Sequence, residues 1–171
     1  MDKTWEIPTL TQLDEPSITL VRPGYKEKYA HTKIASPIYK ELEEFEGRPN
    51  TSYMLVVSVS PNEYWGDNKN NDAFCEYDLM KKHPTFVTEG TFFKNHVNQD
   101  PLKNYGYNAK SFYDDVMKRV LVLVGVDHDK APDIVDDLES GKKISVSMGC
   151  RVKYDVCSIC GNMAPTRKEY C

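Results

Sequence analysis

The sequence predicts an α+β fold that is mainly β, and three stretches carry this prediction. Residues 53–60 and 117–126 are rich in β-branched and large apolar side chains, which is typical of buried strands. Residues 144–151 alternate apolar side chains with serine, glycine and arginine, which predicts a strand with one buried and one exposed face. Segments between these strands have apolar residues at helical spacing, so we expect short helices beside the β-structure.

The size and charge of the chain are those of one globular domain. With 171 residues, it is long enough to bury roughly two-thirds of its unfolded surface. Its formal net charge of -4 gives no electrostatic reason to expect nucleic acid or an anionic membrane as the main partner. Neither a secretory signal nor an apolar run of about 18 residues is present, so we expect a protein of a reducing cytosol that crosses no membrane.

The first part of the chain predicts an extended arm and one short helix. Prolines interrupt residues 1–36, and within them residues 18–21 are the candidate for one edge strand. Pro37 begins a pattern of apolar residues at helical spacing, which a glycine and a proline end. We therefore divide the chain into an N-terminal arm and helix, a main domain and a C-terminal segment, at residues 1–50, 51–153 and 154–171.

Short elements alternate along the middle of the chain. A polar run at residues 62–72 predicts a loop, and the pattern at 74–80 predicts a short helix in which Cys75 is a semi-buried structural thiol. Two strand-like pieces flank Gly90. Farther along we expect a short strand at 106–109, a central buried strand at 117–126 and a helix from Pro132 to Gly141.

Ser147 and His96 are the candidate catalytic residues. Ser147 lies on the exposed face of the strand predicted at 144–151, beside Gly149, which leaves room for another backbone near the hydroxyl. A serine hydroxyl is a weak nucleophile near neutral pH unless a base such as an imidazole accepts its proton. An ordinary half-exposed strand would show the same alternation, and Ser145, on the same face, is an alternative nucleophile. The histidines that we interpret as structural are His83 and His128.

The C-terminal segment carries a metal-binding pattern. Cys157 and Cys160 are followed by Gly161, a spacing that lets two thiolates bind one ion while the glycine closes the turn. Cys171 is the candidate third ligand. Structural zinc normally takes four ligands, so either the fourth lies beyond Cys171 in a longer chain or the site is incomplete. Unliganded thiols and a redox pair are the alternatives, and no thioredoxin-like βαβ pattern precedes the motif.

Several motifs, taken together in their order, resemble those of tailed-bacteriophage prohead proteases. In order they are Asn70-Asn71-Asp72-Ala73-Phe74, His83-Pro84-Thr85-Phe86-Val87, Phe93-Lys94-Asn95-His96-Val97-Asn98-Gln99-Asp100-Pro101 and Val146-Ser147-Met148-Gly149. The resemblance covers residues 53–160. Since that family is similar to herpesvirus assemblin, it implies a herpesvirus-protease-like antiparallel β-barrel with short flanking helices. The cysteine pattern separately predicts a C-terminal segment that resembles a zinc knuckle.

The resemblance also implies a serine endopeptidase of phage head maturation. Its substrates would be phage scaffold and major capsid proteins, cut inside the assembling prohead in the host cytoplasm, and a homo-oligomer is compatible with this activity. Catalysis would need no cofactor, and zinc would be structural. Ser147 would be the nucleophile and His96 its general base. Asn98 and Asp155 are alternatives for orienting His96, and Arg151 or backbone N–H groups would stabilise the oxyanion.

Two other functions fit the same residues. In the first, the chain is a non-catalytic phage head or core component with a zinc knuckle, and the stretch around Ser147 is only structural. In the second, it is a zinc-ribbon binding module, which the acidic net charge disfavours. Cleavage that depends on Ser147 and His96 distinguishes the peptidase from both.

Overall fold

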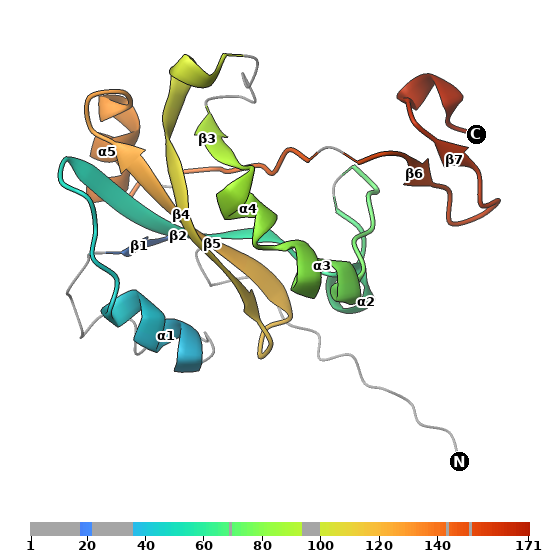
Figure 1. Cartoon of the computed structure of the whole chain (residues 1–171), viewed down its shortest axis with the longest axis horizontal. Helices are drawn as coiled ribbons and strands as arrows, with labels where there is room; N and C mark the ends of the chain where they lie inside the picture. Colours follow the sequence, from blue (N-terminus) through green and yellow to red (C-terminus); the bar gives the residue numbers. More distant parts are fainter. Residues whose placement is uncertain (1–17, 22–35, 69, 94–99, 143, 151) are drawn as a thin grey trace.

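An antiparallel five-stranded sheet forms the centre of the molecule (Figure 1). The computed structural model describes residues 18–21, 36–68, 70–93, 100–142, 144–150 and 152–171. Neighbouring strands are antiparallel throughout, and β5 lies in the middle of the sheet. From one edge to the other the strands are β1 (Ile18–Val21), β2 (Thr51–Val59), β5 (Arg119–Asp127), β4 (Asn104–Asp114) and β3 (Thr91–Phe93).

The sheet is open, so the prediction of a closed barrel is wrong for the residues that the structure describes. Closure requires the two edge strands to pair, but within these residues β1 pairs with β2 alone and β3 with β4 alone. The edge strands are also short, with four residues in β1 and three in β3. Helices cover both faces and bury the apolar side chains without closure. The α+β class and the antiparallel sheet are confirmed, as is the edge strand at residues 18–21.

The two faces of the sheet belong to two separate apolar cores. Helices α3 and α5 contribute to the first core, and helix α1 contributes to the second. Successive residues of β5 alternate between the second and the first core, in the order Leu121, Val122, Leu123 and Val124. A strand that is covered on both faces reads as a continuous apolar run, which explains the composition of residues 117–126. The three helices are α1 (Ser36–Glu43), α3 (Glu76–Lys82) and α5 (Pro132–Glu139).

Two of the predicted elements differ from the structure, one around Gly90 and one at residues 144–150. The strand predicted before this glycine is a single helical turn, α4 (Thr85–Thr88). Pro84 already has helical dihedral angles, with φ −59° and ψ −22°, and the Phe86 N–H donates to the His83 carbonyl at 3.0 Å. The chain therefore turns before it can extend, and Phe86 packs against the first core. A second unpredicted turn, α2 (Asn62–Trp65), lies within the predicted loop.

Residues 144–150 do not form the predicted strand, although part of the predicted alternation is present. No regular secondary structure is assigned to them, and they pair with no described strand. Ile144 and Val146 are partly buried against the first core, while Ser145 and Ser147 are exposed. Contact with the core therefore determines which side chains are buried, although the segment forms no hydrogen-bonded ladder. Cys150, which the alternation places on the apolar face, is exposed.

Short elements complete the described chain. They are η3 (Pro101–Lys103), β6 (Asp155–Val156), β7 (Met163–Ala164) and η4 (Arg167–Glu169). Strands β6 and β7 pair with each other and form a hairpin at the end of the molecule opposite α5 (Figure 1). None of the helices in the described ranges is long and apolar enough to cross a bilayer.

Asp114, at the end of β4, is fully buried and accepts hydrogen bonds from several donors. The Arg119 Nε lies 3.2 Å from its Oδ2, and the Val116 and Met117 N–H groups donate to its Oδ1 at 3.2 and 3.3 Å. The carboxylate therefore holds the β4–β5 turn and neutralises a buried guanidinium at once. Removing one partner of a buried ion pair leaves the other charge without that compensation.

We expect Asp114→Ala to lower the free energy of unfolding by about 3–5 kcal/mol. Its matched control is Asp115→Ala, because the Asp115 side chain is 75% exposed and pairs with Lys118 at 2.6 Å. Exposed pairs contribute little, so the control should lose less than about 1 kcal/mol. Urea unfolding followed by circular dichroism measures both. Equal losses would contradict the role given to Asp114.

Candidate functional site

The C-terminal hairpin places two cysteines in one tight turn. Strand β6 pairs with β7, and the turn between them contains Cys157 and Cys160. The Gly161 N–H donates to the Cys157 carbonyl at 2.9 Å, and the Cys157 N–H donates to the Asn162 carbonyl at 2.9 Å. Gly161 has φ +73°, a left-handed conformation that glycine adopts without strain. The glycine after the second cysteine therefore closes the turn as predicted from the sequence.

Cys171 reaches the same turn because the segment after β7 folds back on the hairpin. The Asn162 side-chain amide donates to the Glu169 carbonyl at 2.9 Å, and the Tyr170 hydroxyl donates to Asp155. These contacts bring the sulfur atoms of the three cysteines within 4.8 Å of one another. Among the residues that the structure describes, this is the one such group of at least three potential ligands, and it has no fourth member.

The three thiols perturb one another's ionisation. Hydrogen bonds from the Cys160 and Ile159 N–H groups, and then from the neighbouring thiols, lower the pKa of Cys157 to about 7. The Ile159 nitrogen lies 3.4 Å from the Cys157 sulfur. Hydrogen bonds with Cys157 and Cys160, together with their negative charge, raise the pKa of Cys171 to about 11. One thiolate thus forms readily, whereas further deprotonation accumulates negative charge that a bound cation would neutralise.

The donor set fits a metal ion that prefers sulfur ligands. A zinc ion lies about 2.3 Å from each thiolate, which places tetrahedral sulfur ligands about 3.8 Å apart. The observed upper bound of 4.8 Å needs only a small contraction to reach that geometry. Cys160 and Cys171 are exposed, so an ion can enter from solvent. The cluster can therefore hold a metal ion and is compatible with structural zinc.

Of the predicted catalytic residues, Ser147 is described and is exposed to solvent. Ser145 is exposed as well, so exposure alone does not distinguish the two nucleophile candidates. His96 and its predicted neighbour Asn98 lie outside the described residues, as does Arg151. Asp155, the other candidate for orienting His96, lies in β6 and accepts a hydrogen bond from Tyr170.

The segment that precedes Ser147 and the strand that precedes the His96 stretch both have side chains packed against the first core. Ile144 and Val146, which precede Ser147, pack against the first core. Phe92 of β3 packs against the same core and contacts Tyr105, with ring centroids 6.4 Å apart. The stretch that contains His96 begins directly after β3. The segment that carries Ser147 and the Phe92 side chain of β3 therefore pack against the same core.

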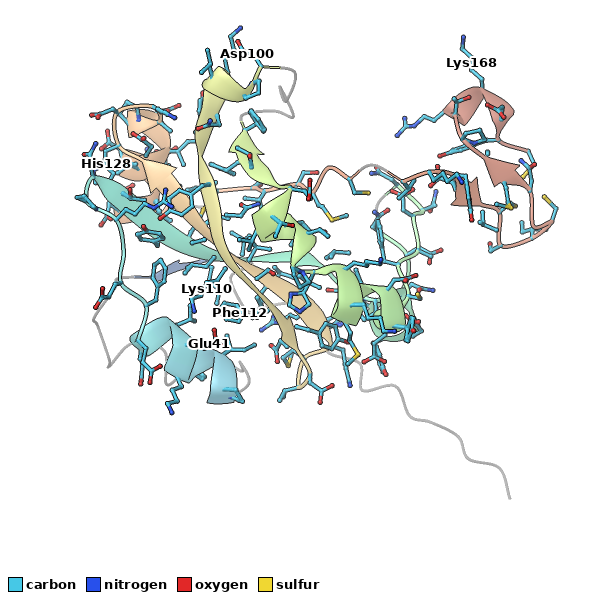
Figure 2. All side chains as sticks on the ribbon, in the orientation of Figure 1. Glu41, Asp100, Lys110, Phe112, His128 and Lys168 are labelled. Atoms are coloured by element: carbon cyan, nitrogen blue, oxygen red, sulfur yellow. The ribbon has the colours of Figure 1, made fainter. Side chains whose placement is uncertain are left out.

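Two serine–histidine contacts do occur among the described residues, and neither was predicted. The Ser52 hydroxyl lies 3.0 Å from His128 Nε2 but donates to Glu139 Oε1 at 3.0 Å. The position of His128 beside the start of α5 is visible in Figure 2. Since the serine proton is directed to the carboxylate, the hydroxyl accepts from the imidazole. His128 therefore does not act as a base toward Ser52.

In the second contact, too, the serine hydroxyl accepts a hydrogen bond from the imidazole. The Ser111 hydroxyl donates to the His83 backbone carbonyl at 2.9 Å, so it accepts from the His83 Nδ1 at 2.9 Å. Burial lowers the pKa of His83, which keeps this imidazole neutral at physiological pH. These contacts fit the structural roles predicted for His83 and His128. No sequence pattern indicates the two serines, because both contacts join residues far apart in the chain.

Cys75 differs from its predicted environment. It is exposed rather than semi-buried, because it precedes α3 at the surface. Its sulfur donates to Asp78 at 3.1 Å, and this hydrogen bond is the main cause that raises the pKa of the Cys75 thiol. A thiol that stays protonated is a poor nucleophile, which fits the structural role predicted for this cysteine.

Comparisons of the chain with known protein families, with curated proteins and with solved structures gave no match.

Proposed function

We propose that this chain is a serine endopeptidase of phage prohead maturation. It cuts scaffold and major capsid proteins inside the prohead that assembles in the host cytoplasm. Ser147 is the nucleophile and His96 the general base. The observation that carries the proposal is the placement of Ser147. This serine is exposed on a segment that packs against the first core, and Phe92, which comes just before the stretch with His96, packs against the same core.

The proposed reaction follows from the chemistry of a hydroxyl and an imidazole. The Ser147 oxygen attacks the peptide carbonyl carbon while His96 accepts the hydroxyl proton. His96 then gives this proton to the leaving amine, and the carbonyl re-forms as an acyl ester on Ser147. Water, deprotonated by the same imidazole, hydrolyses the ester and frees the serine. Backbone N–H groups or Arg151 stabilise the oxyanion that forms in both steps.

The anchoring of the Ser147 segment also supports the proposal physically. A nucleophile must stay within a fraction of an ångström of its productive position, and side chains packed on a core provide that rigidity. Ile144 and Val146 pack against a core that includes Val122 and Val124 of the central strand. A segment without ladder partners keeps its own backbone N–H and C=O groups available to a peptide substrate.

The metal cluster has a structural role in this proposal. Cys157, Cys160 and Cys171 would hold zinc, which would cross-link the hairpin to the segment after β7. Structural zinc normally takes four ligands, and the cluster would supply three of them. Zinc takes no part in the chemistry, because the cluster lies on the hairpin at the end of the molecule that Lys168 marks in Figure 2. Ser147 lies on the segment that leads toward that hairpin.

Coexpression of the full chain with phage scaffold and major capsid proteins tests the proposal. We expect discrete cleavage products with the unmodified chain and none with Ser147→Ala or His96→Ala. Ser52→Ala is the matched control, because Ser52 also contacts a histidine but directs its proton to Glu139. Mass spectrometry of the products identifies the cut bonds. Products that persist in both catalytic variants would leave a non-catalytic phage head component as the better assignment.

A further inference from the structure

A polar pocket of about 490 Å³ lies at one end of the sheet, away from the cysteine cluster. Its walls come from the start of β2, the end of β5, the starts of β3 and β4, and the turn before α5. Two cations line it, Arg48 and Lys130, together with the single carboxylate of Asp127. A pocket of this size accommodates a small ligand or one group of a larger one.

Arg48 is held in place by two contacts that use none of its side-chain N–H donors. Its guanidinium lies over the Tyr107 ring, 3.9 Å from the centroid, and its backbone N–H donates to the Tyr53 hydroxyl at 2.7 Å. Tyr53 in turn contacts the Tyr107 hydroxyl at 2.5 Å. A cation–π contact of this kind occupies no N–H donor with a hydrogen-bond acceptor, so these donors can bind a ligand. In the described part of the chain, no carboxylate lies within ion-pair distance of Arg48.

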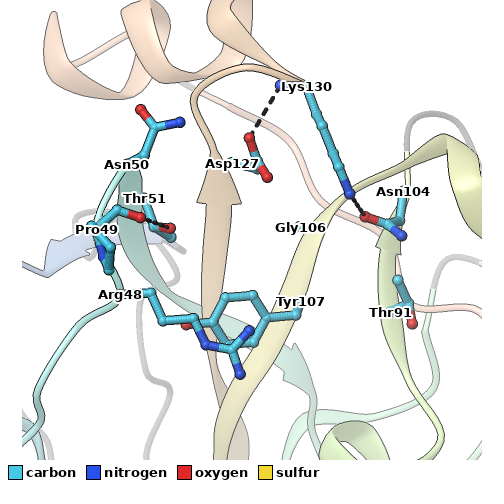
Figure 3. A pocket seen from close by; sticks show the side chains of 10 residues that line it. All are labelled: Arg48, Pro49, Asn50, Thr51, Thr91, Asn104, Gly106, Tyr107, Asp127 and Lys130. Atoms are coloured by element: carbon cyan, nitrogen blue, oxygen red, sulfur yellow. Dashed lines mark hydrogen bonds between the residues drawn. The ribbon is translucent and has the colours of Figure 1, made fainter.

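Lys130 approaches the same pocket from the turn between β5 and α5. Its ammonium donates to the Asn104 side-chain oxygen at 2.9 Å, and Figure 3 shows the side chain reaching across the pocket toward β4. Its ammonium, like the Arg48 guanidinium, has no carboxylate partner within the described ranges. The Asn104 amide oxygen accepts from one of the three N–H donors of the ammonium group but does not neutralise its charge. A second cation thus lies on the side of the pocket opposite Arg48 (Figure 3).

The one carboxylate in the pocket wall is engaged with the backbone. Asp127 Oδ1 accepts from the Asp129 N–H at 2.9 Å and from the Lys130 N–H at 3.3 Å, which closes the turn. The charged groups in the wall therefore sum to one excess positive charge, from two cations and one anion. An anion entering the pocket meets two cations that pair with no carboxylate among the described residues.

We propose that this pocket binds a ligand that carries a carboxylate or phosphate group. The Arg48 guanidinium donates two parallel hydrogen bonds to two oxygens of the group, and Lys130 supplies a second positive charge. A preorganised guanidinium loses little side-chain entropy on binding, and its stacked position on Tyr107 supplies that preorganisation. The proposal is independent of the peptidase assignment, because none of its residues belongs to the catalytic pair or to the cysteine cluster.

Two-dimensional 1H–15N NMR of the full chain tests the proposal. The probes are inorganic phosphate and glutarate, and potassium chloride at matched ionic strength is the reference. We expect saturable shifts of the amides of Thr51, Gly106 and Tyr107 with at least one probe, but only small linear shifts with chloride. Saturation by phosphate alone identifies a phosphate site, and saturation by glutarate alone identifies a carboxylate site. Saturation by both identifies a general oxyanion site.

Variants separate a built site from nonspecific attraction. We expect Arg48→Gln to weaken binding ~10-fold or more, and Lys130→Gln to weaken it by a smaller factor. Lys103→Gln is the matched control, since Lys103 is a nearby cation that pairs with Asp100 at 3.8 Å and does not line the pocket. Dispersed spectra confirm that each variant is folded. The proposal would be overturned if neither probe gave saturable shifts, or if all three variants weakened binding equally.

Discussion

Ser147→Ala is expected to abolish covalent labelling of this chain by a fluorophosphonate, whereas Ser145→Ala is expected to leave the labelling rate largely unchanged. Fluorophosphonates react with serines whose hydroxyl is activated by a base, and an unactivated serine reacts ~10³-fold or more slowly. Both serines are exposed on the same segment, so access to the reagent does not separate them. The difference in rate therefore reports which hydroxyl His96 activates.

The structure supplies two further controls for this experiment. Ser52 and Ser111 each lie 3.0 Å or less from a histidine nitrogen, so a reagent that merely favoured serines near histidine would label them. Their protons are directed to Glu139 and to the His83 carbonyl, which removes the hydroxyl proton from the imidazole's reach. We expect Ser52→Ala and Ser111→Ala to keep the full labelling rate.

Mass spectrometry of the labelled peptide and the time course of labelling measure the effect. His96→Ala should slow labelling by the ~10³-fold or more expected of an unactivated serine, whereas Ser147→Ala removes the labelled oxygen itself. Labelling that depends on Ser145 and on His96 would move the nucleophile by two residues and keep the mechanism. Labelling that none of the serine variants removes would contradict the assignment of an activated serine to this segment.

The parts of the fold that were predicted correctly from the sequence are those in which local pattern and tertiary burial agree. Residues 53–60 and 117–126 are apolar because β2 and the central strand β5 are covered on both faces, and a β-branched run of this kind is typical of such strands. The helix that begins at Pro132 combines a proline start with an apolar stripe, Ile134, Val135 and Leu138, which packs on the first core.

The errors arose where the same pattern is compatible with two structures. Residues 144–150 alternate as a strand does, but alternation records only which side chains face a core. Whether a ladder forms depends on a partner edge, and that edge is not encoded in the segment itself. Residues 84–87 contain β-branched and aromatic side chains, yet hydrogen bonds from Phe86 and Val87 back to His83 and Pro84 form a helical turn. A barrel likewise requires pairing between distant edges.

The cysteine cluster was predictable because its spacing encodes its geometry. Two cysteines separated by two residues and followed by glycine define a turn from local chain geometry alone. The approach of Cys171 was harder to predict, since it depends on contacts such as the one between Asn162 and Glu169. The serine–histidine contacts of Ser52 and Ser111 could not be found, because they join positions 76 and 28 residues apart.

Removal of metal is expected to unfold the C-terminal hairpin while the central sheet stays folded. The two hairpin strands have two residues each, and Val156, Ile159 and Met163 are largely exposed, so burial of apolar side chains contributes little. Small units of this kind depend on a metal ion for stability. We expect a chelator to collapse the NMR signals of residues 155–171 toward random-coil positions, with the signals of β2 and β5 unchanged.

Cys160→Ser should have the same effect as the chelator, and Cys75→Ser is its matched control. Both cysteines are exposed, but Cys75 contacts Asp78 outside the cluster. Elemental analysis should give one zinc ion per chain for the unmodified protein and for Cys75→Ser, and much less for Cys160→Ser. A hairpin that keeps its signals without metal would contradict a structural role for the ion.

Acid should release the metal, because protons compete with it for the thiolates. The pKa of Cys157 is lowered to about 7, so this thiol becomes protonated as the pH falls below that value, and metal affinity should decline there. The pKa of Cys171 is raised to about 11, so at neutral pH its thiol must lose a proton when the ion binds. Titration of the metal-free chain with zinc in two buffers of different ionisation enthalpy measures the protons released. Binding without proton release would show that Cys171 is not a ligand, and contacts such as Tyr170–Asp155 and Asn162–Glu169 would then hold the terminal segment on the hairpin.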